Sequence, residues 1–355
     1  MIGLLAVLPA LLAAAAPPAP SGDGAPRVYV ANQAAAKVTV IDPVGDSIVT
    51  IVDLQSLGFS AHAKPHHVAV EPDGSYWYVS LVGDNAVVKF DRNNHVVGRA
   101  SMETPGLLAL DPHSDRLFAT RSMSAVRAPS RIGVIRRSDM SIEEVEVLVP
   151  RPHALAVSRD GHYAYIGSLG TNQVAVYDVR RDRVDVVDVP GDSNRVMVQF
   201  AVSPDGRTLA ATAQLTGEVL ALDLRDPARP ALVHTARVGK WPWHVAFSPR
   251  GNEVWVPNQL SDDVSVIDAA TWTVSRTISD SGFAQPHGVA VAPNGQVLIS
   301  NHNGGHTMDM GGVGMAMGDT SRPGHVVVID IAHHRVLRTL ETAPDGAGMG
   351  SSGGR

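Results

Sequence analysis

Histidine recurs at one position of this sequence, directly after a proline-containing step and directly before a short apolar run. The segments are Pro65-His66-His67, Pro152-His153, Pro242-Trp243-His244 and Pro286-His287. Imidazole is the commonest protein ligand for transition metals and titrates near neutral pH. Because proline fixes the approach of the chain, each segment presents its imidazole in a similar way. The pattern therefore predicts a histidine cluster.

Two registers are present in these segments. Counted from the apolar run that follows, His66, His153 and His287 share one register, and His67 and His244 share the neighbouring one. Successive residues of an extended strand point to opposite sides. The spacing thus predicts that His66, His153 and His287 converge, and leaves open whether the other two histidines join them.

A second set of soft ligands lies in an irregular Met/His/Gly-rich segment, residues 301–325. It contains His302, His306, Met308 and Met310. Thioether sulfur with imidazole suits copper, especially Cu(I), better than it suits zinc. The predicted metal ligands are therefore His66, His67, His153, His244, His287, His302, His306, Met308 and Met310.

Plainer explanations exist for both features. Each histidine can hydrogen-bond a backbone carbonyl at a channel mouth, and the methionines can be adaptable apolar contacts in a flexible loop. The sequence has no cysteine, which removes thiolate ligands, thiol nucleophiles and disulfides together. No nucleophile elbow or phosphate-binding loop is found, so the sequence assigns no catalytic residue.

The elements that position these residues follow from an internal repeat. A phrase of the type Val-Ala-Val-x-Pro-Asp-Gly begins at Val68, Leu108, Leu155, Phe200, Val245 and Val289, at intervals of 40 to 47 residues. Short β-type runs with turn residues between them, at this period, are typical of propeller blades. We predict an all-β fold, a seven-bladed β-propeller of four-stranded antiparallel blades.

The repeat also places the histidines in the predicted ring. They precede the innermost strand of each blade, so they lie at the mouth of the central channel, and residues 301–325 join the second and third strands on the same face. The first repeat lacks an inner strand of its own. Either the Gly-rich tail supplies it, or one blade has three strands.

At the end of the second strands the motifs Tyr29-Val30-Ala31-Asn32, Trp255-Val256-Pro257-Asn258 and Leu298-Ile299-Ser300-Asn301 appear. With the Pro-Asp-Gly turns, they make residues 27–342 resemble the YVTN family of β-propeller repeat proteins. The resemblance implies the propeller fold. It leaves function open among exported proteins of unknown role, surface-layer proteins, lactonase-like propellers and distant redox propellers of the haem d1 and nitrous-oxide reductase type.

Composition limits the partners and the compartment. The net charge of −6 provides no basic field for nucleic acid. Residues 2–16 form an apolar run of signal-peptide length, followed by a Pro/Gly-rich linker. The expected organisation is a signal peptide and linker at 1–26, a propeller at 27–342 with its insertion at 301–325, and a tail at 343–355, in a periplasmic or secreted protein without a membrane span.

These observations predict an exported binding protein that holds a metal ion, copper before zinc, or a small ligand at the channel mouth. Two alternatives remain open at this stage. One is an interaction scaffold without metal, with a protein partner on the same face. The other is a metal- or haem-dependent oxidoreductase or a lactonase-like enzyme.

Overall fold

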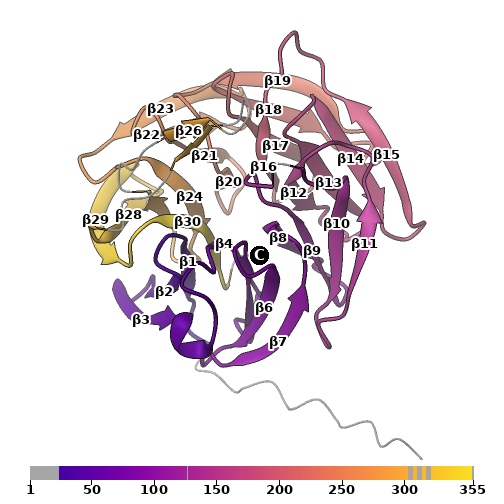
Figure 1. Cartoon of the computed structure of the whole chain (residues 1–355). Helices are drawn as coiled ribbons and strands as arrows, with labels where there is room; N and C mark the ends of the chain where they lie inside the picture. The colour runs from indigo at the N-terminus through magenta and orange to yellow at the C-terminus, as the bar shows by residue number, and fades with distance from the viewer. Residues whose placement is uncertain (1–23, 126, 303–306, 310–313, 317–320, 354–355) are drawn as a thin grey trace, which may run out of the picture.

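The chain forms the predicted ring of blades. The structure, a computed structural model, describes residues 24–125, 127–302, 307–309, 314–316 and 321–353. Seven four-stranded antiparallel sheets are arranged around a central channel (Figure 1). The fold predicted from the repeat, an all-β seven-bladed propeller, is confirmed.

Each blade runs from an inner strand at the channel to an outer strand at the rim. The inner strands are β4 (Pro65–Val70), β8 (Pro105–Leu110), β12 (Pro152–Val157), β16 (Met197–Val202), β20 (Ala246–Phe247), β24 (Pro286–Val291) and β30 (Gly346–Ser351). The second strands are β1 (Val28–Asn32), β5 (Tyr76–Leu81), β9 (Arg116–Arg121), β13 (Tyr163–Ser168), β17 (Thr208–Ala213), β21 (Glu253–Asn258) and β25 (Gln296–Asn301).

The outer half of each blade completes the sheet. The third strands are β2 (Lys37–Asp42), β6 (Ala86–Asp91), β10 (Arg131–Arg136), β14 (Gln173–Asp178), β18 (Glu218–Asp223), β22 (Asp263–Asp268) and β28 (Gly324–Asp330). The outer strands are β3 (Ser47–Asp53), β7 (Val96–Ser101), β11 (Ile142–Glu146), β15 (Arg183–Asp188), β19 (Ala231–Arg237), β23 (Thr273–Ser279) and β29 (Arg335–Thr342). A short 3-10 helix, η1 (Gln55–Leu57), precedes β4.

The ring closes with strands from opposite ends of the chain. β30 pairs with β1, so the sheet order of this blade is β3-β2-β1-β30. The tail therefore donates a strand, which decides between the two alternatives that the sequence left open. The propeller extends through Ser351, beyond the boundary at residue 342 expected from the sequence.

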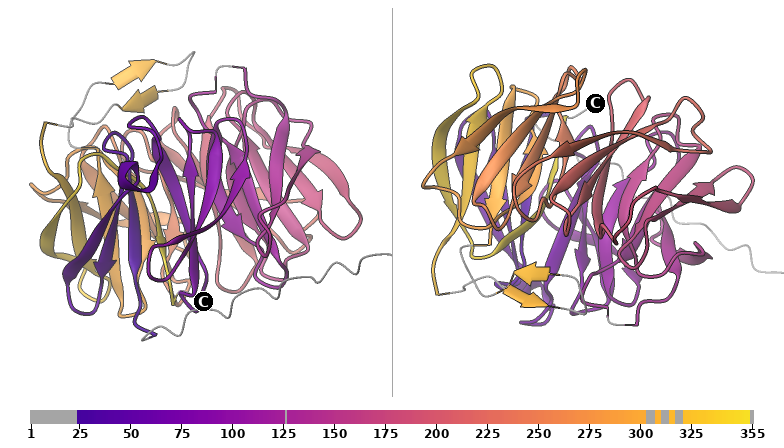
Figure 2. Two further views of the ribbon diagram at one scale, coloured as in Figure 1. Left: turned by 60° about the horizontal axis from the view of Figure 1, so that its bottom comes forward. Right: turned by 90° about the horizontal axis from the view of Figure 1, so that it is seen from above.

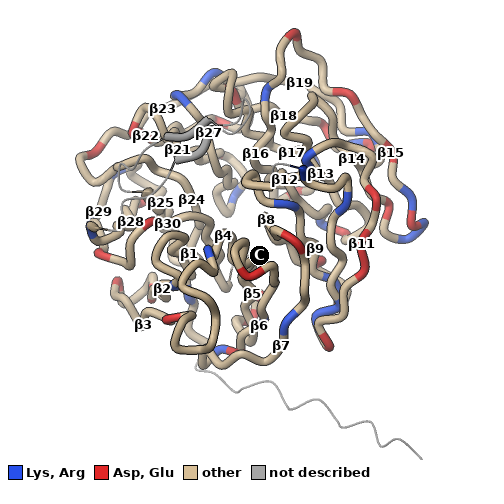
Figure 3. Tube along the Cα trace, viewed as in Figure 1, with Lys and Arg blue, Asp and Glu red and all other residues tan. Residues whose placement is uncertain are grey.

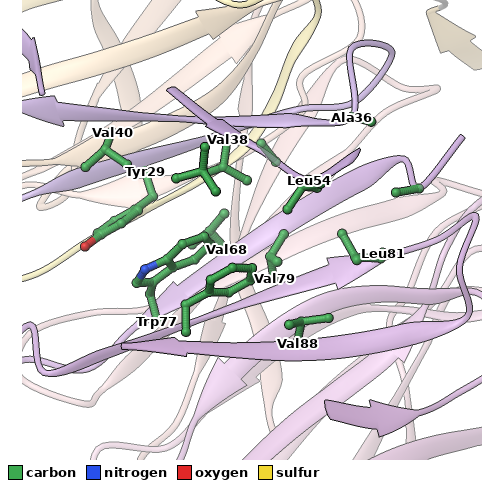
Figure 4. Packing of buried hydrophobic residues seen from close by; sticks show 14 of the residues in the cluster. Tyr29, Ala36, Val38, Val40, Leu54, Val68, Trp77, Val79, Leu81 and Val88 are labelled. Atoms are coloured by element: carbon green, nitrogen blue, oxygen red, sulfur yellow. The ribbon is translucent and has the colours of Figure 1, made fainter. Parts of the chain in front are cut away.

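The core lies between neighbouring sheets. Second strands are buried along nearly their whole length, whereas outer strands such as β3 mainly alternate exposed and partly buried residues. Between the first two blades, Trp77 stacks on Tyr29 and Phe90, with ring centroids 5.0 and 4.0 Å apart (Figure 4). Acidic and basic residues are both spread over the outer parts of the ring (Figure 3).

The Pro-Asp-Gly phrase forms the turn between the first and second strands. Gly74, Gly206 and Gly251 have φ angles of 69°, 74° and 73°, a conformation that glycine adopts without steric cost. This turn lies at the far end of the inner strand from the histidines. The repeat thus fixes both ends of each inner strand.

The Met/His-rich insertion joins β25 to β28. Within it, β26 (Thr307–Asp309) and β27 (Gly314–Ala316) form a two-stranded hairpin. The hairpin stands off one face of the ring, and the chain ends at the opposite face (Figure 2). We call the hairpin side the mouth face. Because inner strands begin at this face, the histidines and the insertion lie on the same side, as the repeat predicted.

Candidate functional site

Six buried histidines gather where the inner strands begin. His66 and His67 are in β4, His153 in β12 and His287 in β24, and His244 lies just before β20. His302 directly follows β25. None of the six is more than 8% exposed. We call this set, His66, His67, His153, His244, His287 and His302, the histidine cluster.

The rings of the cluster contact one another through both registers. His287 lies 4.5 Å from His302 and 4.8 Å from His244, measured between ring centroids. His67 lies 5.6 Å from His244, and His66 lies 6.0 Å from His153. The neighbouring registers therefore meet, although simple alternation along a strand would separate them.

A β-bulge at the Pro-His step explains this convergence. The pairing register shifts between Pro65 and Val68 in β4 and between Pro286 and Val289 in β24. A bulge adds a residue and changes the direction of the side chains around it. Consecutive residues such as His66 and His67 can then both lie in the channel region.

A hydroxyl on the second strand holds the bulge in place. Thr212 Oγ1 accepts the N–H of Gln199 at 3.2 Å and donates to the carbonyl of Trp243, in the next blade, at 2.6 Å. Ser300 makes the matching pair of bonds, to Gly288 N at 2.9 Å and to Ala347 O at 2.6 Å.

The hydroxyl also links the cluster to neighbouring blades. Thr120 bonds Leu107 N at 3.2 Å and the His153 carbonyl at 2.7 Å, and Ser80 Oγ accepts the N–H of His67 at 3.1 Å. The hydroxyl thereby satisfies the backbone group that the bulge frees, and in Thr120, Thr212 and Ser300 it also ties the blade to the next.

Glycine makes room for the cluster where the repeat lacks histidine. A Cβ on Gly348 of β30 would lie 2.6 Å from the His66 carbonyl oxygen and 2.8 Å from Cδ2 of His67. A Cβ on Gly106 of β8 would lie 2.5 Å from the Arg121 carbonyl oxygen. The Gly-rich sequence of β30 is therefore a packing requirement of the channel, which sequence reasoning missed.

Hydrogen bonds fix the proton position on three rings. His153 Nδ1 lies 2.7 Å from the Arg121 carbonyl oxygen, and His66 Nδ1 lies 3.3 Å from Gln33 Oε1. His302 Nδ1 bonds the carboxylate of Asp345, which is itself 3% exposed. Since each partner only accepts, Nδ1 carries the proton and the lone pair of a neutral ring lies on Nε2.

Two buried ring nitrogens of the cluster have no hydrogen-bond partner among the described residues. They are His66 Nε2 and His287 Nδ1. A buried polar atom without a partner costs free energy, so such atoms are rare unless a ligand or water satisfies them. Both belong to rings that contact another histidine of the cluster.

Burial keeps five of these imidazoles neutral, those of His66, His67, His153, His244 and His287. Loss of solvation lowers the pKa of His67 and of His153 to about 4. Burial, followed by repulsion from the neighbouring imidazoles, lowers the pKa of His66, His244 and His287 well below the ordinary value. Neutral rings offer the lone pairs that a metal ion requires.

The arrangement is close to, but not yet, a set of metal ligands. Within the residues that the structure describes, no three His, Asp or Glu side chains are already arranged as a metal-binding group. Two imidazoles on one ion at about 2.0–2.1 Å place their ring centres roughly 5 Å apart, and the trio His244, His287 and His302 has separations of 4.8 and 4.5 Å. These two separations match that spacing.

The structure places only part of the predicted ligand set. His66, His67, His153, His244, His287 and His302 come together, whereas His306 and Met310 lie outside the described residues. Met308 is in β26, and its side chain is not described. Asp345 and Gln33 were missed, because no local motif marks a residue that reaches the cluster from a distant part of the chain.

In the part of the chain that the structure describes, no helix has the length and apolar character needed to cross a bilayer.

Comparison with known proteins agrees with the fold. The NHL repeat family matches residues 283–308, a stretch that includes β24, β25 and His302. A search of curated proteins gives no match.

Solved structures share the architecture at low sequence identity. Dihydro-haem d1 dehydrogenase NirN, in complex with DHE, has a TM-score of 0.63 at 14% identity, over 94% of this chain and 77% of that chain. A candidate 6-phosphogluconolactonase from Bacteroides fragilis has a TM-score of 0.66 at 13% identity, over 94% and 99%. Streptogramin B lyase has a TM-score of 0.63 at 11% identity, over 81% and 87%. Identities of this size support the fold alone, and with the seven blades they show that the chain is a β-propeller repeat protein.

Proposed function

We propose that this protein binds one late first-row transition-metal ion, copper before zinc, in the histidine cluster at the mouth face. The observation that carries the proposal is the gathering of six buried imidazoles whose rings contact one another in two groups, one of four (His67, His244, His287 and His302) and one of two (His66 and His153). Two of these rings have a buried nitrogen with no hydrogen-bond partner in the part of the chain that the structure describes. Contacts between neutral imidazole rings stabilise the folded chain little. A bound metal ion, in contrast, would coordinate the lone pairs of several rings at once.

His287 is the central ligand in this proposal. Its ring contacts both His244 and His302, at 4.8 and 4.5 Å, and its buried Nδ1 has no hydrogen-bond partner among the residues that the structure describes. His302 is backed by Asp345, the carboxylate–histidine arrangement that orients metal ligands and raises their basicity. His66 offers a further buried lone pair, on Nε2.

The preference for copper rests on ligand chemistry. Imidazole suits copper and zinc alike, and soft thioether ligands favour Cu(I). Met308 and Met315, in the hairpin on the same face as the histidine cluster, are the source of such ligands. We further propose export to the periplasm or the medium, which the apolar run at residues 2–16 supports and cell fractionation tests.

The decisive experiment measures metal bound by purified protein without an affinity tag. The protein is dialysed against copper, zinc or both, and bound metal is determined by mass spectrometry. We expect close to one equivalent of copper in the original protein and loss of it in His287→Ala. His234→Ala, which removes an exposed histidine of the outer strand β19, is the matched control. Absence of uptake by the original protein, or full retention by H287A, would overturn the proposal.

A second function, a scaffold for a protein partner, is favoured by a different observation on the same face. Leu57, Leu148, Leu215 and Leu260 are 42%, 59%, 47% and 40% exposed. Each lies in a loop that opens on the mouth face, where a partner would cover it. Replacing Leu215 and Leu260 by Asp should abolish pull-down of such a partner from the periplasm and leave metal uptake intact.

A further inference from the structure

One histidine of the cluster, His67, carries its proton on the other ring nitrogen, Nε2. The backbone N–H of Leu108 donates to His67 Nδ1 at 3.3 Å. A backbone N–H can only donate, so Nδ1 of His67 is the unprotonated nitrogen. The neutral ring, which burial maintains, therefore carries its proton on Nε2. This differs from His66, His153 and His302, whose Nδ1 atoms face acceptors.

In this protonation state His67 cannot bind a metal ion through either ring nitrogen. Nδ1 is engaged by Leu108, and Nε2 bears a proton that a metal ion would have to displace. A ring in this state is a hydrogen-bond donor. His67 contacts His244, a member of the proposed metal trio, with 5.6 Å between ring centroids, so a ring that acts as a donor borders the trio.

One further feature favours an anionic ligand on this side of the cluster. Arg151 directly precedes Pro152-His153, and its positive charge acts on the His153 ring. A nearby cation favours a small anion.

We propose that the metal site takes a small anionic ligand, of the hydroxide or azide class, and that His67 donates its Nε2–H to this ligand rather than binding the ion. The inference rests on the proposed metal site and deepens it. His67 is then a specificity-determining residue. It makes the site selective for ligands with a lone pair available to a second donor.

The test uses azide as the probe on the full chain loaded with Cu(II). Azide binding is followed by the azide-to-copper charge-transfer absorption, and bound copper is measured in parallel. We expect His67→Phe to retain near-stoichiometric copper but to weaken azide binding roughly tenfold, the cost of one hydrogen bond to a charged group. His67→Gln, which restores an N–H donor, should recover most of the affinity.

The outcomes separate this inference from the proposed function. Loss of copper in H67F, with normal folding by circular dichroism, would make His67 a ligand and overturn the donor role. Unchanged azide affinity in H67F, or no azide binding by the original copper protein, would overturn it equally. Failure of the original protein to bind copper removes the metal site itself. His67→Leu serves in place of H67F where phenylalanine does not fit beside Gly348, and His234→Phe is the distant control.

Discussion

At the scale of single residues, the six imidazoles are chemically unequal although the repeat makes them look alike. Their neighbours decide the difference: a carbonyl for His153, an amide for His66, a carboxylate for His302 and a backbone N–H for His67. Each partner fixes which nitrogen carries the proton. A site built from identical motifs can therefore contain both lone-pair donors and an N–H donor.

Asp345 should be the residue outside the cluster with the greatest effect on metal affinity. We expect Asp345→Asn to weaken copper binding about 10–100-fold, because the neutral amide lowers the basicity of His302. The backbone tolerates this change, since Asp345 has a φ of 62° and asparagine also adopts this region. Competition with a chelator measures the affinity, and Asp139→Asn, an exposed site, is the control. Equal affinities in D345N and the original protein would contradict the role of Asp345.

The buried neutral histidines predict that the metal-free protein loses stability in mild acid. His67 and His153 have a folded pKa of about 4, below the value of 6.5 in an unfolded chain. Between these values the unfolded chain binds protons that the folded chain does not, so the free energy of unfolding falls as pH decreases from about 7 to about 4.

Urea unfolding in the presence of a chelator, at pH 7.5, 6.5, 5.5 and 5.0, would show this as a steady decrease of the midpoint. The variant H234A should give the same slope, because that side chain is exposed. A midpoint that stays constant from pH 7 to pH 5 would mean that the cluster accepts protons in the folded state.

At the scale of elements, the second strand controls where the cluster lies. In three blades its hydroxyl residue bonds the bulge of its own inner strand and a carbonyl of the next blade, as Thr212 does with Gln199 and Trp243. The histidine after each bulge is thus positioned by a strand that does not contain it. This connects ring assembly directly to the geometry of the channel mouth.

Removal of one such hydroxyl should be costly although the side-chain volume is conserved. We expect Thr212→Val to lower the free energy of unfolding by about 1–3 kcal/mol, because a buried N–H and a buried carbonyl lose their partner. Thr235→Val, on the exposed outer strand β19, should change it little. Urea unfolding of the two variants measures the difference, and equal midpoints would contradict the linking role of the hydroxyl.

Much of this architecture could be predicted from the sequence, and the rest depends on contacts between distant residues. The period and the alternation of apolar residues predicted the blades, and the place of the Pro-His step in the repeat predicted the cluster at the mouth. Alternation could not show that His66 and His67 both reach it, because a β-bulge breaks the alternation. The partners Asp345 and Gln33 come from the two ends of the ring, which no local pattern connects.

At the scale of the whole molecule, the segment that closes the ring also completes the histidine cluster. β30 inserts between β24 and β4, both of which carry histidines, and pairs with β1. Asp345, immediately before β30, bonds His302 and accepts the N–H of Ala34 at 3.0 Å. A strand composed of Gly346-Ala347-Gly348-Met349-Gly350 has little β propensity of its own. Its position is therefore determined by the space that the other blades leave.

Because that space is narrow, we predict that replacing a glycine of β30 by a larger residue destabilises the fold. A Cβ on Gly350 would lie 2.5 Å from the Val68 carbonyl oxygen, and one on Gly348 would lie 2.6 Å from the His66 carbonyl oxygen. Both oxygens belong to the backbone of β4, which cannot withdraw without disturbing its own blade. We expect Gly348→Ala and Gly350→Ala each to lower the free energy of unfolding by about 1–3 kcal/mol, the range for overpacking.

The two substitutions should differ in their effect on metal. Gly348 also faces the His67 ring, whereas Gly350 lies beside Val68, so only G348A should alter the site in addition to ring closure. Gly45→Ala is the control, because its nearest neighbour is the movable carboxylate of Asp42 at 3.0 Å. Urea unfolding and azide titration of the copper protein measure the two effects. If G348A and G350A weaken azide binding equally, ring closure alone governs the site, and the contact of β30 with His67 has no separate role.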